Sequence, residues 1–396
     1  MSMVPSDLSF ADLLLQLAEE GKVPVTRIDE AVRRILVLKR KLGLFDDPLR
    51  GLGASPVGSP EAHRAALESA QESMTLLKNE KNLLPLAKSA RILVTGPTAD
   101  SLIPLNNGWT YTWQGDRPLL YPKDSLTILG AIRAKAGAAN VTYVPGTEIE
   151  RELDVAAAVR AAQNTDVIVA SLGEWSYTET PGNLDDLTLP EAQLRLVEQL
   201  AATGKPIVLV MAEGRPRIIR RIADLAGAIL MAYNPGNFGG QAVADVLFGD
   251  VNPSGKLPFT YPRSPNALLT YDRAAFQITG ATFGLKSFAP QFEFGHGLSY
   301  TTFAYSDLKL DKLQWGPQDR VEASMKVANT GPRAGKEVVQ LYVTALVSRL
   351  APASKRLRRF AKVYLEPGES RTLRFTLEPG DFSFFDEQGT LVLEPG

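Results

Sequence analysis

Two glutamates five residues apart, Glu174 and Glu179, are the side chains of this sequence best suited to acid–base chemistry. They lie in Gly173-Glu-Trp-Ser-Tyr-Thr-Glu-Thr180, beside the aromatic residues Trp175 and Tyr177. An aromatic neighbour that excludes water raises the pKa of a carboxyl group, and a carboxyl group that keeps its proton near neutral pH can act as a general acid. The stretch therefore predicts a glutamic acid catalyst whose proton is retained by desolvation.

The residues on either side place this stretch at the end of a strand. Asp166-Val-Ile-Val-Ala-Ser-Leu172 is a short apolar run, typical of a buried parallel strand. Pro181-Gly-Asn-Leu-Asp-Asp186 has the composition of a loop, and a helical pattern begins at Pro190-Glu191. Ligands bind outside the carboxyl ends of the strands in open α/β sheets, so both glutamates are expected at the binding edge.

A second polar and aromatic stretch, Asn106-Asn-Gly-Trp-Thr-Tyr-Thr-Trp-Gln-Gly-Asp116, follows the first strand of the same pattern. It is therefore expected at the same edge of the sheet as Glu179. The flat faces of Trp109 and Trp113 can stack on the C–H faces of sugar rings, while neighbouring amides and carboxylates bind hydroxyl groups. The alternative is that both indoles fill a gap beneath the loop, because large aromatic side chains are usually well buried. The residues alone leave these two alternatives open.

Strand and helix patterns alternate through the middle of the chain. Strands are expected at 91–95, 141–144, 166–172, 206–211 and 227–233, and helices near 125–136, 152–163, 190–202, 215–224 and 238–248. A long helix from Pro60 to about Asn79 precedes them. This alternation predicts an α/β fold with a mostly parallel sheet covered by helices on both faces, an αβα sandwich.

The ends of the chain differ from this middle part. Two amphipathic helices near the start cannot bury their apolar faces alone, and short strands of period two after Tyr300 predict an all-β sandwich. Val392-Leu-Glu-Pro-Gly396 ends about where a last strand would follow. Five segments are expected: two helices in 1–48, a linker in 49–59, the α/β domain in 60–265, a connecting segment in 266–300, and the β-sandwich in 301–396.

Composition excludes several classes of function. The formal net charge is −1, with 43 basic and 44 acidic side chains, so there is no electrostatic case for binding nucleic acid or an anionic membrane. Cysteine is absent and only two histidines occur, which argues against a thiolate or histidine metal site. No run of about 18 apolar residues predicts a transmembrane helix. Met1-Ser-Met-Val-Pro5 lacks the basic start and apolar core of a signal peptide.

The chain resembles glycoside hydrolase family 3 over nearly its whole length and in the family's order. The segments that carry the resemblance are Glu72–Asn79, Asn107–Gly115, Gly173–Thr180, Gly214-Arg-Pro216, Ala244–Pro258 and Phe294–Phe303. The family joins a (β/α)8 barrel to an α/β sandwich, often followed by a fibronectin type III-like domain. The resemblance implies hydrolysis of O-glycosidic bonds by a retaining, exo-acting β-glucosidase.

The resemblance also assigns roles to individual residues. Glu179 matches the family's acid/base, and Trp113 matches an aromatic platform for the sugar at subsite +1, with Trp109 beside it. Glu174 is the rival acid and a candidate substrate contact; the preferred alternative is a structural carboxylate that accepts protons from loop amides. No cofactor and no metal ion are implied.

Part of the family's catalytic site has no match in this sequence. A retaining glycosidase needs a second carboxylate as nucleophile, and the family's nucleophile is an aspartate of the barrel. Residues 1–48 resemble only the last barrel helices, so the chain is expected to be either a truncated reading frame or one half of a split pair whose partner chain carries the barrel. The alternative is an inactive carbohydrate-binding or structural fragment. Glucose is the sugar that the family implies; the compartment is periplasmic or extracellular if the full-length protein has a signal peptide, and otherwise cytoplasmic.

Overall fold

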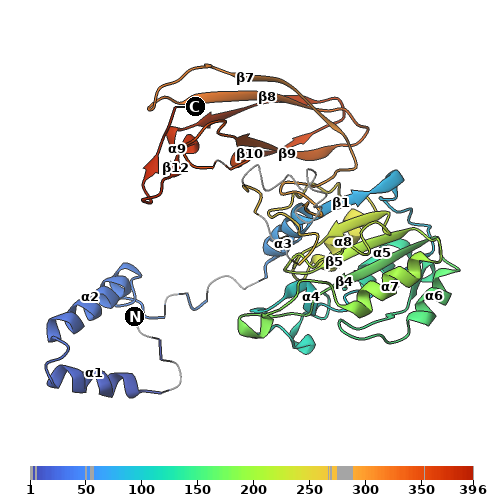
Figure 1. Ribbon diagram of the computed structural model, residues 1–396. Helices are drawn as coiled ribbons and strands as arrows, with labels where there is room; N and C mark the ends of the chain where they lie inside the picture. The colour runs from blue at the N-terminus through green and yellow to red at the C-terminus, as the bar shows by residue number, and fades with distance from the viewer. Residues whose placement is uncertain are drawn as a thin grey trace. The chain divides into compact units, whose positions relative to one another are not determined.

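The structure is a computed structural model that describes residues 3–4, 7–49, 51–53, 58–265, 267, 270–273, 289–351 and 353–395. It divides into two compact units, Met1–His63 and Arg64–Gly396. The first unit contains helices α1 (Ser9–Glu19) and α2 (Val25–Lys41), neither of which has a buried residue (Figure 1). The prediction of two helices with unburied apolar faces is thus confirmed.

A six-stranded sheet forms the centre of the second unit. Its strands are β1 (Thr75–Asn79), β2 (Ile92–Thr95), β3 (Val141–Tyr143), β4 (Val167–Gly173), β5 (Ile207–Ala212) and β6 (Ala228–Met231). Their order is β1-β6-β5-β4-β2-β3, and only β1 runs antiparallel to its neighbour. The predicted mostly parallel sheet is confirmed.

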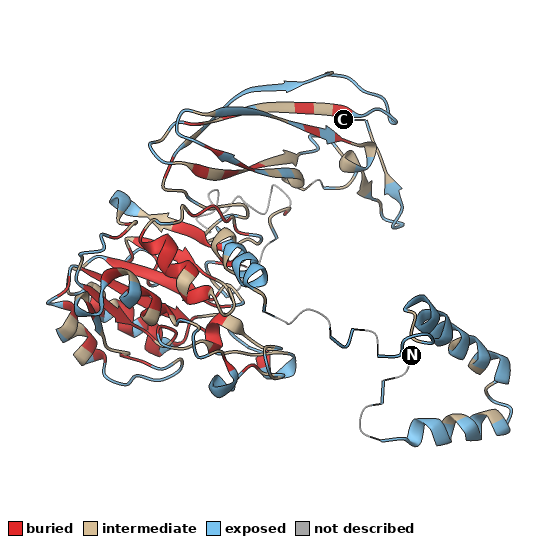
Figure 2. Ribbon diagram, turned by 180° about the vertical axis from the view of Figure 1, so that it is seen from behind, coloured by how far each residue is buried: buried red, intermediate tan, exposed pale blue. Residues whose placement is uncertain are grey.

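Helices cover both faces of this sheet, which explains why its strands β4, β5 and β6 are almost wholly apolar. The core on one face includes residues of α3 (Pro60–Ser73), α5 (Ile128–Ala136) and α8 (Gly239–Leu247); the other includes residues of α6 (Val155–Ala162) and α7 (Glu191–Ala201). Successive strand residues join opposite cores, as Ile168 and Val169 do. Strands β2, β4, β5 and β6 are accordingly buried along their length (Figure 2).

The order of the strands reverses between β2 and β4. From β2 the chain passes through α5 to β3 on one side, whereas from β4 it passes through α7 to β5 on the other. At such a switch point the loops after the two central strands diverge and leave a crevice for a ligand. The two aromatic stretches singled out above, 106–116 and 173–180, are carried by these two loops.

Three sequence expectations in this domain are wrong. The helix expected to continue to about Asn79 ends at Ser73, because Thr75–Asn79 pairs with β6 as β1. Residues 215–224 form turns rather than a helix, and Ile218 exchanges backbone hydrogen bonds with Leu187 and Leu189. Leu257-Pro-Phe-Thr-Tyr261, whose proline predicts an edge strand, forms only a single bridge between Tyr261 and Phe292.

Short antiparallel sheets follow the α/β domain, as predicted. They contain β7 (Phe303–Leu310), β8 (Val321–Asn329), β9 (Gly335–Val343), β10 (Arg356–Leu365), β11 (Ser370–Leu377), β12 (Phe384–Phe385) and β13 (Leu391–Val392), with the short helix α9 (Pro379–Phe382) before β12. They pair as β11-β8-β7, β10-β9 and β12-β13. Phe382-Ser-Phe-Phe385, where the period-two pattern predicts a strand, is divided between α9 and β12, and β12 pairs with β13.

The β-sandwich is attached to the α/β domain by charged side chains. Lys336 on β9 and Lys362 on β10 both pair with Glu72 near the end of α3. Lys256 pairs with Glu337 at 3.2 Å. Much of the predicted connecting segment 266–300 lies outside the described residues. No helix of the described ranges is both long enough and apolar enough to cross a lipid bilayer.

Candidate active site

The loops after β2 and β4 are hydrogen bonded to each other. The side-chain oxygen of Asn107 accepts from the backbone N–H of Tyr177 at 2.8 Å. Gln114 accepts from the N–H of Thr178 at 3.1 Å and donates to its carbonyl at 3.2 Å. A Cβ at Gly108 would lie 2.6 Å from the carbonyl oxygen of Tyr177, so this close approach requires glycine. These contacts bring the loop with the two tryptophans against the residues that directly precede Glu179.

Trp109 and Trp113 belong to one tight turn and are exposed. The N–H of Trp109 donates to the carbonyl of Trp113 at 2.8 Å, and the side chains are 70% and 47% exposed. Tyr111, between them, is also exposed and accepts a hydrogen bond from Asn237. This exposure contradicts the alternative that the indoles fill a gap beneath the loop. Stacking of the indoles on a sugar stays a prediction.

Glu179 lies at the exposed middle of the loop after β4. Its backbone is in the left-handed region, with φ of 52°, and the short 3-10 turn Thr180–Gly182 follows. Within the described residues its carboxylate has no hydrogen bond or ion pair. Trp175 and Tyr177, expected to desolvate one of the two glutamates, leave Glu179 exposed: Trp175 is itself 45% exposed, and Tyr177 packs against an arginine.

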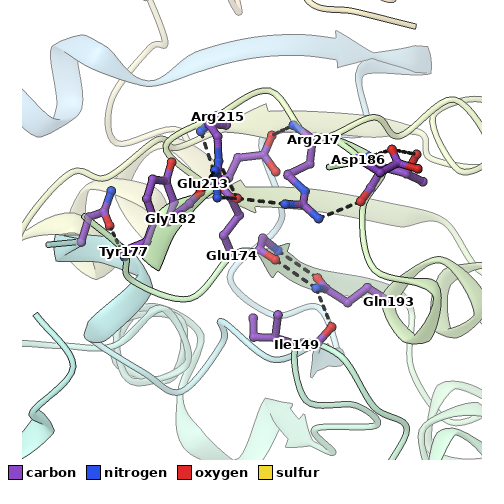
Figure 3. Close-up of polar contacts among 12 residues, drawn as sticks. Ile149, Glu174, Tyr177, Gly182, Asp186, Gln193, Glu213, Arg215 and Arg217 are labelled. Atoms are coloured by element: carbon purple, nitrogen blue, oxygen red, sulfur yellow. Dashed lines mark hydrogen bonds and ion pairs between the residues drawn. The ribbon is translucent and has the colours of Figure 1, made fainter. Parts of the chain in front are cut away.

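Glu174, in contrast, is buried, and its carboxylate accepts hydrogen bonds from two arginines (Figure 3). Its Oε2 accepts from Arg215 at 2.7 and 3.0 Å and from Arg217 at 3.1 Å. Its Oε1 accepts from the backbone N–H of Arg215 at 3.3 Å. The structure therefore does not bring Glu174 to the surface with Glu179 and the tryptophans. It favours a structural carboxylate, although most of the donors are guanidinium groups rather than the expected loop amides.

The start of the loop is fixed by a buried amide. Gln193 on α7 accepts from the N–H of Gly173 at 2.9 Å and donates to its carbonyl and to that of Ile149, each at 3.0 Å (Figure 3). Gly173 has φ of 150°, and a Cβ there would lie 1.9 Å from the carbonyl oxygen of Ala212 on β5. Only glycine fits this end of β4, so the loop leaves the sheet in one direction.

Sequence reasoning missed the two arginines that hold this loop. Arg215 bonds Glu174 and the carbonyl of Gly182, and its guanidinium lies 3.8 Å from the centroid of the Tyr177 ring. Arg217 bonds Glu174 and, at 2.7 Å, the carbonyl of Thr188. Arg215 could have been singled out from the sequence, because it lies in the Gly214-Arg-Pro216 segment that carries the family resemblance. The helix expected over 215–224 concealed that both arginines point toward Glu174.

A second buried glutamate, Glu213, lies at the end of β5 next to this cluster. Its Oε1 accepts from the hydroxyl of Tyr261 at 2.9 Å and from the N–H of Arg217 at 3.2 Å. Burial, together with the negative charge of Glu174, raises the pKa of Glu213 well above its ordinary value. The folded chain therefore favours the protonated form of Glu213 more than the unfolded chain does. Within the described residues no group of acidic or histidine side chains is arranged to hold a metal ion.

Glu213 should make the stability of the domain fall as pH rises. Its pKa is higher in the folded than in the unfolded state, so the unfolded chain loses this proton first, and unfolding is favoured above the ordinary glutamate pKa until the folded pKa is reached. We expect Glu213→Gln to gain stability relative to the wild type by up to about 1.4 kcal/mol per pH unit above pH 5. Urea unfolding between pH 5 and 8 measures this difference.

The exposed Glu387 provides the control for this measurement. The Glu387→Gln chain should unfold with a free energy within about 0.5 kcal/mol of the wild type, because substitutions of exposed side chains change stability little. Parallel curves for Glu213→Gln and the wild type would show that Glu213 does not keep its proton in the folded chain.

Comparisons with known proteins identify the family. Residues 74–300 match the Glycosyl hydrolase family 3 C-terminal domain, and residues 337–396 match the Fibronectin type III-like domain. The chain is 39% identical over 418 residues to "Lysosomal beta glucosidase" of Dictyostelium discoideum, a match that covers 100% of this chain and 50% of that protein. It is 36% identical over 380 residues to "Beta-xylosidase" of Formosa agariphila, covering 93% and 52%.

The fold of this chain is also similar to solved structures of β-glucosidases. The crystal structure of β-glucosidase from Listeria innocua in complex with glucose matches with a TM-score of 0.87 at 33% identity, over 97% of this chain and 54% of that chain. The chain thus spans about half the length of the relatives it matches. It belongs to glycosyl hydrolase family 3, of which it carries the C-terminal domain and the fibronectin type III-like domain.

Proposed function

We propose that this chain supplies the acid/base half of a retaining β-glycosidase that acts on β-linked glucosides. Glu179 is the acid/base, and Trp113 with Trp109 forms a platform for the sugar on the leaving-group side. A (β/α)8 barrel provides the nucleophile and the contacts to the sugar that is transferred. The observation that carries the proposal is the exposed carboxylate of Glu179 on a loop bound to the loop of two exposed indoles.

The two steps of such a reaction use Glu179 in both of its protonation states. The barrel's carboxylate attacks the anomeric carbon while protonated Glu179 donates its proton to the glycosidic oxygen; the C–O bond breaks, and the alcohol leaves. Glu179, now ionised, then takes a proton from water, whose oxygen attacks the anomeric carbon and displaces the nucleophile. Retention requires the two carboxylates to lie about 5–5.5 Å apart, so the barrel must come close to the Glu179 loop.

The exposure of Glu179 supports a site in which this chain provides the acid/base and a barrel provides the nucleophile. The carboxyl group is exposed in this chain, whereas a general acid at neutral pH needs a site that disfavours its charge. A barrel placed over the loop would exclude water from Glu179 and bring a second carboxylate near it, and both effects raise the pKa of an acid. The nucleophile and the desolvation of the acid would then come from the same partner.

The identity of the sugar rests on the relatives. Relatives of this chain carry the names β-glucosidase and β-xylosidase, and a related structure was solved with glucose. Glucose and xylose differ by the hydroxymethyl group of the transferred ring, which the barrel contacts. We therefore propose β-linked glucosides as the first substrate class, with xylosides second.

Mixing this chain with a barrel tests the proposal. The barrel should be the part of a relative that precedes the region matched here, because that part contributes what this chain does not supply. We expect hydrolysis of 4-nitrophenyl β-glucoside by the mixture and none by either part alone. Turnover by the lone chain would contradict the assignment of the nucleophile to the barrel. Binding of cello-oligosaccharide without turnover in any mixture would instead support the carbohydrate-binding alternative, for which the exposed indoles also argue.

A further inference from the structure

The loop that carries Glu179 is exposed at its middle but fixed near its base. Glu179 and Thr180 are exposed, and Glu179 adopts a left-handed backbone conformation that non-glycine residues rarely adopt without support. Gly182 donates its N–H to the carbonyl of Glu179 at 2.9 Å, so the position of Gly182 determines how Glu179 is presented. A residue that holds Gly182 therefore acts on the proposed acid/base without touching the substrate.

Arg215 makes three kinds of contact with this loop (Figure 3). It forms a two-pronged ion pair with Glu174, before Glu179, at 2.7 and 3.0 Å. Its third nitrogen, Nη1, donates to the carbonyl of Gly182, after Glu179. Its guanidinium plane covers the ring of Tyr177, at 3.8 Å from the centroid. One side chain thus connects residues on both sides of Glu179 with the end of β5.

The neighbours of Arg215 leave the loop little freedom to adopt another arrangement. A Cβ at Gly182 would lie 2.6 Å from Cδ2 of Tyr177, so the loop is in contact with itself at this point. The backbone of Tyr177 is in turn held by Asn107 of the loop with the two tryptophans. Arg215 therefore couples Glu179 to the loop that carries the proposed sugar platform.

We propose that Arg215 is a positioning residue that fixes the Glu179 loop and thereby sets the place of the acid/base relative to Trp109 and Trp113. The inference rests on the proposed function. Lysine cannot replace arginine here: a single ammonium group can pair with Glu174 but cannot also reach Gly182 and cover the ring of Tyr177. Arg215→Lys therefore separates the fixing of the loop from the mere presence of a positive charge.

Hydrogen exchange of the full chain tests the fixing of the loop without any need for turnover. In Arg215→Lys we expect the amides of Tyr177, Thr178 and Gly182, which are hydrogen bonded in the wild type, to exchange at least tenfold faster. The amides of β4 and β5 should remain unchanged. Arg221→Lys is the matched control, since Arg221 also forms forked ion pairs, with Glu191 and Glu198, but away from this loop. Unchanged exchange in the loop would overturn the inference.

A second variant acts on the same contact from the other side. Gly182→Ala places a methyl group against Tyr177 and should push the Gly182 carbonyl away from Arg215. Faster exchange of the same amides is expected. If both variants left the loop protected, the interaction between Arg215 and Gly182 would be irrelevant to its conformation.

Kinetics of the mixture with a barrel then connect the loop to the chemistry. Arg215→Lys should lower kcat for 4-nitrophenyl β-glucoside by about 10- to 100-fold with KM nearly unchanged, because a displaced acid transfers its proton poorly although the sugar still binds. The loss of kcat/KM, which reports the formation of the glycosyl-enzyme alone, should be smaller for 2,4-dinitrophenyl β-glucoside, whose leaving group needs little protonation. A raised KM with unchanged kcat, or an equal loss for both substrates, would contradict a positioning role. Since exchange is read on the chain alone, failure of the proposed function would leave the result for the loop interpretable.

Discussion

Replacing Glu179 by glutamine is expected to lower kcat of the chain–barrel mixture by about 10²- to 10⁴-fold for a β-glucoside with a poor leaving group. Glutamine keeps the size and hydrogen-bonding capacity of the side chain but cannot transfer a proton. Because Glu179 is exposed, the substitution should change the free energy of unfolding by no more than about 0.5 kcal/mol. Steady-state kinetics on methyl β-glucoside, together with urea unfolding, measure both effects.

The nature of the leaving group distinguishes loss of an acid from loss of binding. With 2,4-dinitrophenyl β-glucoside the leaving group departs as an anion, so the glycosyl-enzyme should still form in the Glu179→Gln mixture and then accumulate. Azide attacks that intermediate without needing a general base, so it should restore turnover and yield the β-glucosyl azide. Asp185→Asn, at an exposed position of the same loop, is the control and should retain activity. An active Glu179→Gln enzyme would exclude Glu179 as the acid/base.

Replacing Glu174 by alanine is expected to destabilise the α/β domain by about 3–5 kcal/mol. The Arg217 side chain is only 8% exposed, and without Glu174 its guanidinium would remain buried and lose the ion pair that it makes at 3.1 Å. The midpoint of urea unfolding of the chain measures the loss. Glu191→Ala is the matched control, because the ion pair of Glu191 with Arg221 is exposed and worth about 0–1 kcal/mol.

This second prediction also decides the role of Glu174 in the site. If Glu174 contacted substrate, its removal would weaken sugar binding and leave the free energy of unfolding nearly unchanged. If it is the structural carboxylate that its contacts indicate, stability falls first. An alanine variant as stable as the Glu191→Ala control would therefore contradict the structural role.

The sheet could be predicted from the sequence because its signal is local. Each parallel strand is buried on both faces and shows as a short apolar run, as 167–173 and 207–212 do. Strand β1 was missed because Thr75–Leu77 continues the apolar pattern of the preceding helix, and its pairing with β6 joins residues some 150 positions apart. In 215–224, Ile218, Ile219 and Ile222 have the spacing of a helical face. Their side chains are buried, but the backbone of this segment forms turns instead of a helix.

The candidate site was predicted less completely, because the type of a residue does not determine whether the fold buries or exposes its side chain. The sequence suggested that Glu174 and Glu179 share one place, whereas burial separates them: one lies beneath the loop and the other on it. The exposure of Trp109 and Trp113 also depends on how their turn leaves the sheet, which Gly108 and Asn107 determine through contacts with the other loop. The pairing of Arg215 and Arg217 with Glu174 could not be inferred, because it joins the ends of two different strands.

The loop after β4 is fixed where it leaves the sheet and exposed at its middle. This difference has a practical consequence for protein engineering. Trp109, Tyr111 and Trp175 all present side chains to solvent. Under the proposed function, these are the side chains that a new aglycone would meet. Randomised libraries at these positions should yield mostly folded variants, whereas libraries that include Glu174 or Arg217 should be filled with unfolded ones. Directed evolution of leaving-group preference should therefore begin at the aromatic surface of these two loops.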